Sequence, residues 1–151
     1  MTILTKAQII EMLTNDNSAS MRESNLRCLE LINKCGNDFV CDNSTTSNNK
    51  INRGELVEAI IKYILGIDTT KAQAHEIDLP QYDIEIKYAT RTSYASNCNP
   101  KTKNVILINT KEIVLLNANQ LIKNSKGRIA PRYNGTPIEN KLIQKIKMAL
   151  N

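Results

Sequence analysis

The sequence is poor in aromatic residues and in histidine. It has no Trp, one Phe and one His among 151 residues, and aromatic residues make up 4% of the chain. Aliphatic side chains must therefore form most of the core, and a chain of this length can bury one within a single domain. There is no apolar run of about 18 residues and no signal-peptide pattern. We therefore expect a cytoplasmic protein that is not associated with a membrane.

Cysteine and histidine together do not indicate a zinc site. The four cysteines are Cys28, Cys35, Cys41 and Cys98, and their spacing lacks the paired C-x-x-C pattern of structural zinc sites. A structural zinc would need most of them together with His75, the single histidine. Free and mostly buried thiols are the prediction, which suits a reducing compartment.

Charge is divided unevenly along the chain. Residues 1–86 contain 8 Lys and Arg against 13 Asp and Glu, a net charge of −5, whereas residues 87–151 contain 12 against 2, a net charge of +10. A strongly basic region is the electrostatic signature of a protein that binds a polyanion. The alternative is an ordinary solubilising surface, although such a surface seldom separates the two signs so clearly. The pattern favours nucleic-acid binding.

The periodicity of apolar residues predicts helices, then strands, then further helices. Thr5 is the expected N-cap of the first helix. The predicted helices are 6–13, 20–34, 53–65, 117–124 and 138–150, the last beginning near Pro137, and the clearest predicted strands are 83–88, 104–109 and 112–116. The last two strands are expected to form a hairpin. This order predicts an α/β or α+β domain with a mixed central sheet of about four strands.

The most informative segment is the alternating run that ends at Tyr88. It places apolar side chains on one strand face and charged side chains on the other. The apolar positions are Ile84, Ile86 and Tyr88, and the charged positions are Asp83, Glu85 and Lys87. Clustered carboxylates with a nearby lysine can hold a divalent cation and act on a phosphate, and Asp78 lies close by in the sequence. The alternative is the ordinary solvent face of a half-buried strand.

The predicted helix at 53–65 offers another acidic side chain. Glu58 lies at the edge of its apolar face and could reach inward. An ion pair between Glu58 and Lys62, four residues apart on a solvated face, is an equally good interpretation.

These motifs resemble the PD-(D/E)XK nuclease superfamily, which has the restriction-endonuclease-like fold. Asp78 would be its aspartate, and Glu85-Ile86-Lys87 its E-x-K. The spacing of these motifs is similar to that in the nicking endonuclease of mismatch repair and in type II restriction enzymes. The run from Arg53 to Glu58 resembles the helix start of several members. The resemblance covers about residues 50–125, with a helical segment at 1–49 and a basic extension with a helix at 126–151, all within one nuclease domain.

The resemblance implies a role for each matching residue. Asp78, Glu85 and the Ile86 carbonyl would ligate Mg²⁺, or Mn²⁺, and Lys87 would orient or deprotonate the attacking water. Glu58 would hold a metal-bound water or a second ion. Glu55 is the alternative to Glu58, and Asp83 is the alternative to Asp78.

A basic, polar region follows the E-x-K strand and is the candidate for contacts with phosphates and bases. Its residues are Arg91, Lys101, Lys103, Lys126, Arg128 and Arg132, together with Tyr133. The alternative is a solvated loop.

Taken together, the motifs, the resemblance and the charge distribution make a Mg²⁺-dependent DNA endonuclease that acts as a homodimer or higher oligomer the leading hypothesis. A non-catalytic DNA-binding protein with the nuclease fold and an RNA-cleaving toxin on the same scaffold are the alternatives.

Overall fold

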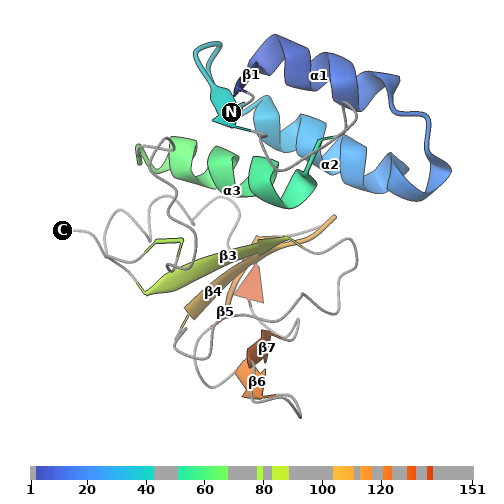
Figure 1. Cartoon of the computed structure of the whole chain (residues 1–151). Coiled ribbons are helices and arrows are strands. Elements are labelled where there is room, and N and C mark those ends of the chain that lie inside the picture. The colour runs from blue at the N-terminus through green and yellow to red at the C-terminus, as the bar shows by residue number, and fades with distance from the viewer. Residues whose placement is uncertain are drawn as a thin grey trace. The chain divides into compact units, whose positions relative to one another are not determined.

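The structure is a computed structural model (Figure 1). It describes residues 3–42, 51–67, 78–79, 83–88, 104–110, 113–116, 121–123, 129–131 and 136–137. The chain divides into two compact units, Met1–Lys71 and Ala72–Asn151, which we call the first and second units and describe separately. The division falls after the helix that carries Glu58, whereas the sequence suggested that the nuclease core begins at residue 50. A single nuclease domain stays a prediction.

The first unit contains three helices, as the sequence predicts for this region. They are α1 (Lys6–Asn15), α2 (Arg22–Ile32) and α3 (Arg53–Ile64), and a short 3₁₀ helix, η1 (Ala19–Met21), precedes α2. The predicted N-cap of α1 is confirmed. The Thr5 hydroxyl accepts a hydrogen bond from the Gln8 N–H at 3.3 Å, and the Gln8 side chain accepts one from the Thr5 N–H at 2.9 Å. This capping box satisfies two backbone donors that α1 would otherwise leave unpaired.

Helix α3 has a well-defined signal at each end. The Asn52 side chain accepts a hydrogen bond from the Glu55 N–H at 3.1 Å, which caps the start. Gly66 follows the helix with a φ of 71°, a conformation that glycine adopts without steric cost. The Gly66 N–H binds the Tyr63 carbonyl and the Ile67 N–H binds the Lys62 carbonyl. These two bonds form a Schellman motif and confirm Gly66 as the helix stop.

The helices of the first unit pack through aliphatic side chains, α1 against α2 and α2 against α3. Among the most deeply buried residues are Ile9, Leu31, Ile32, Phe39, Leu56, Val57 and Ile60. Two three-residue strands, β1 (Ile3–Thr5) and β2 (Val40–Asp42), pair antiparallel beside them. The sequence analysis did not predict these strands, because three residues are too few to show a period of two.

Three of the four cysteines lie in the described part of the chain, and all three are free and buried as predicted. Burial raises the pKa of Cys28 and of Cys35 to about 11, and that of Cys41 to about 12. Such thiols stay protonated at neutral pH and are poor nucleophiles or metal ligands. Cys98 lies outside the described residues.

The second unit is built on a mixed sheet, as the sequence predicts. Its strands are β3 (Ile84–Tyr88), β4 (Asn104–Ile108), β5 (Ile113–Leu116) and the two-residue β8 (Thr136–Pro137), in the order β3-β4-β5-β8. Strands β3 and β4 run parallel, whereas β4–β5 and β5–β8 are antiparallel. Pairing of Ile108 with Ile113 confirms the predicted β4–β5 hairpin. The four residues from Val105 to Ile108 are fully buried, which explains their unbroken apolar run.

One predicted helix is wrong. Part of segment 117–124 forms β6 (Leu121–Lys123), which pairs antiparallel with β7 (Ile129–Pro131). Helix propensity is a weak preference over so few residues, and the backbone hydrogen bonds of a paired strand override it. Pro137, the expected start of the last helix, lies in β8, and residues 138–150 lie outside the described part.

Within the described residues, none of the helices has the length and apolar character needed to cross a membrane.

Candidate functional site

Strand β3 carries the central candidate residues with the predicted alternation. Ile84 and Ile86 are buried, whereas Glu85 and Lys87 are partly exposed. The two charged side chains therefore share the more accessible face of the strand. This pattern puts a carboxylate and an ammonium side by side, two positions apart.

Asp83 does not extend this charged face, and that part of the sequence prediction is wrong. β3 begins at Ile84, and Asp83 has a φ of 55° in the turn before it. A left-handed residue breaks the alternation of a strand, and aspartate is one of the few residue types that tolerate it. The Asp83 carbonyl accepts a hydrogen bond from the Asn104 N–H at 3.2 Å, so the turn is joined to the start of β4.

Asp78 lies directly against β3. Leu79 and Ile84 form an antiparallel bridge, with N–H to carbonyl distances of 2.9 and 3.2 Å. Next to this bridge, Oδ2 of Asp78 accepts a hydrogen bond from the Ile86 N–H at 2.8 Å. The bridge and this hydrogen bond thus place the predicted aspartate beside the peptide between Glu85 and Ile86.

Backbone geometry places the Ile86 carbonyl on the same side as Asp78. Within a strand, the N–H and the carbonyl of one residue point to the same edge. Both groups of Ile84 bind Leu79, and the Ile86 N–H binds Asp78, so the Ile86 carbonyl is directed to that edge as well. The other edge of β3 pairs with β4. A carboxylate and a carbonyl oxygen therefore occur together at one edge, beside Glu85.

This set of oxygen donors fits a hard divalent cation. Mg²⁺ is commonly held by one or two carboxylates and keeps several waters, and Asp78, Glu85 and the Ile86 carbonyl supply oxygen atoms of that chemical type. Within the ranges that the structure describes, no three His, Cys, Asp or Glu side chains are grouped so as to hold a metal ion. In the second unit the candidate site thus consists of two carboxylates and one carbonyl.

Glu58 belongs to the first unit and has a defined partner there. Its Oε1 lies 2.8 Å from Nζ of Lys62, one turn further along α3. The Lys62 side chain is 9% exposed and that of Glu58 is 27% exposed. The ion pair that the sequence left open is therefore present, and it compensates the charge of a nearly buried lysine. A role of Glu58, or of the partly buried Glu55, at a metal site stays a prediction.

The predicted nucleic-acid contacts all lie outside the described residues. These are Arg91, Lys101, Lys103, Lys126, Arg128, Arg132 and Tyr133, and His75 also falls outside.

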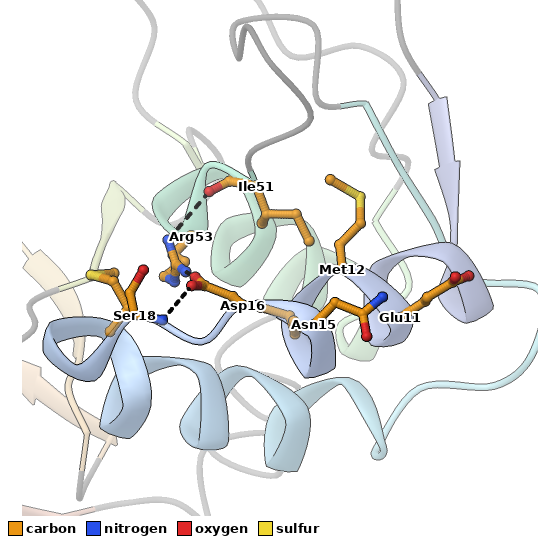
Figure 2. A pocket seen from close by; sticks show the side chains of 9 residues that line it. Glu11, Met12, Asn15, Asp16, Ser18, Ile51 and Arg53 are labelled. Carbon is orange, nitrogen blue, oxygen red and sulfur yellow. Dashed lines mark hydrogen bonds and ion pairs between the residues drawn. The ribbon is translucent and has the colours of Figure 1, made fainter.

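The first unit contains a pocket that the sequence analysis missed (Figure 2). Its volume is about 600 Å³, and side chains of α1, of the residues after it and of the start of α3 line it. Arg53 lies at its wall. The guanidinium contacts Oδ2 of Asp16 at 2.7 Å and donates to Oδ1 of the buried Asn25 at 2.6 and 2.8 Å. Asp16 follows the last residue of α1, Asn25 lies near the start of α2, and Arg53 is the first residue of α3, so these contacts connect all three helices.

Asp16 is fixed in the ionised form at this wall. A hydrogen bond from the Ser18 N–H, at 2.9 Å, contributes most to keeping the pKa of Asp16 well below its usual value. The Ser18 and Asn25 side chains and the positive charge of Arg53 act in the same direction. Asp16 and Arg53 are 37 residues apart in the sequence, so no local sequence pattern predicts their contact.

Comparison with known proteins finds no matching family model, no matching curated protein and no matching solved structure.

Proposed function

We propose that this protein is a Mg²⁺-dependent DNA endonuclease with a restriction-endonuclease-like core, which hydrolyses phosphodiester bonds. The observation that carries the proposal is the 2.8 Å hydrogen bond from the Ile86 N–H to Asp78. It brings together an aspartate and an E-x-K strand that are separate in the sequence. The mixed sheet with a parallel β3–β4 pair supports the same fold class.

Each residue of the second unit has a chemical role in this proposal. Asp78, Glu85 and the Ile86 carbonyl would hold the cation, which when bound would polarise the phosphate and lower the pKa of water. Lys87 orients or deprotonates the attacking water and stabilises the negative charge that develops on the phosphate. Mn²⁺ would fit the same oxygen ligands.

The charge distribution supports DNA as the partner. Residues 87–151 carry a net charge of +10, and such a region binds a phosphate backbone by releasing counterions. Two copies would be needed to cut both strands of a duplex, since one set of these residues acts on one phosphate. A homodimer or higher oligomer is therefore part of the proposal.

The hydrogen bond to Asp78 has a structural role as well, because it satisfies a backbone donor at the edge of the sheet. Catalysis must therefore be tested directly. The experiment is to incubate supercoiled plasmid with the wild-type protein and with Glu85→Gln and Lys87→Met, with Mg²⁺ and with a chelator. Glu11→Gln is the matched control, since it removes an exposed carboxylate from the first unit.

We expect Mg²⁺-dependent cutting by the wild-type protein and by Glu11→Gln, and loss of cutting by the other two variants. Nicked products indicate action on one strand, and linear products indicate a dimer that cuts both. Unchanged cleavage by folded Glu85→Gln would overturn the site. Salt-sensitive DNA binding without any cutting would support the non-catalytic alternative, and cutting of RNA alone would support the toxin.

A further inference from the structure

No further inference is drawn: the strongest candidate, the pocket between the C-terminal end of α1 and the start of α3, has Asp16 and Arg53 at its wall already paired with each other, and nothing in the described part of the chain indicates what would occupy it.

Discussion

Each of the two units holds an aspartate against a backbone N–H, but the surroundings of the two side chains differ. In the first unit, Asp16 accepts from Ser18 at 2.9 Å and forms an ion pair with Arg53. In the second unit, Asp78 accepts a hydrogen bond from the Ile86 N–H at 2.8 Å. Ile86 lies in β3, between the charged residues Glu85 and Lys87. Asp16 therefore links the end of α1 to the start of α3 through Arg53, whereas Asp78 lies beside the strand that carries Glu85 and Lys87. The side chains around a hydrogen-bonded aspartate therefore decide what its carboxylate can do.

Substitutions in the core of each unit should have the largest effect on the free energy of unfolding, and they test whether the two units unfold independently. Ile60 on α3 and Ile106 on β4 are both fully buried. Replacing either with Ala should lower the free energy of unfolding by about 2–5 kcal/mol, because it removes buried methyl groups and leaves a cavity. Urea denaturation followed by circular dichroism measures the loss.

The shape of that denaturation curve sharpens the comparison. Two transitions, each shifted by one of the variants, would show that the units unfold separately. One transition shifted by both variants would show a single cooperative domain, as the sequence predicts. A loss below about 1 kcal/mol at either position would contradict the described packing.

The two aspartates provide the next test, through matched substitutions. Asp78→Asn should slow Mg²⁺-dependent plasmid cleavage by about 100-fold, a typical effect of removing one charge-stabilising group from an active site. Asp16→Asn should leave the rate close to that of the wild-type protein, provided that circular dichroism shows it to be folded. Equal rates for the two variants would remove Asp78 from the site.

Arg53 tests whether the charged network holds the first unit together. Arg53→Met removes both donors to the buried carbonyl oxygen of Asn25 and should cost about 2 kcal/mol in the free energy of unfolding. Arg22→Met, at an exposed position on α2, is the control and should change it by less than about 0.5 kcal/mol. Thermal denaturation compares them. Equal stability of the two variants would show that the network contributes little.

Two left-handed residues, one in each unit, give a smaller effect. Gly66 has a φ of 71° with open space where a Cβ would stand, so Gly66→Ala tests backbone strain alone and should cost about 1 kcal/mol. Asp83→Gly should change stability by less than about 0.5 kcal/mol, since relief of strain offsets the added freedom of the unfolded chain.

Asp83→Gly also tests the site. We expect the variant to keep full cleavage activity, because the proposal assigns the metal to Asp78. Loss of cleavage in a folded Asp83→Gly protein would restore Asp83 as a candidate ligand.

The pH dependence of stability gives the smallest expected effect, because solvent screens the partly exposed Asp16. Its pKa is lower in the folded protein than in the unfolded chain. Asp16 therefore stabilises the fold above the unfolded pKa of about 3.9, and this contribution is lost as the pH falls toward the folded value. Below about pH 5, melting temperatures of the wild-type protein should fall more steeply than those of Asp16→Asn. If the melting temperatures of the two proteins fell equally steeply with pH, Asp16 would not be the source of this pH dependence.

The sequence alone determined the features that depend on neighbouring residues. Thr5 and Gly66 mark helix ends because their hydrogen bonds form within a few residues. The alternation of apolar and charged residues in β3 and the unbroken apolar run of β4 are readable in the sequence, because one face of β3 and both faces of β4 are buried. Part of the candidate site could be predicted in the same way, since Glu85 and Lys87 share a strand face by their spacing alone.

Only the tertiary structure decided the rest, because it depends on partners that are distant in the chain. The pairing of β1 with β2, the strand β6 where a helix was predicted, and the contact between Asp16 and Arg53 all join segments that carry no shared local pattern. Asp78 is the instructive case. Its spacing from Glu85 indicated a site, but the turn at Asp83 and the bridge between Leu79 and Ile84 are what bring its carboxylate to the Ile86 peptide.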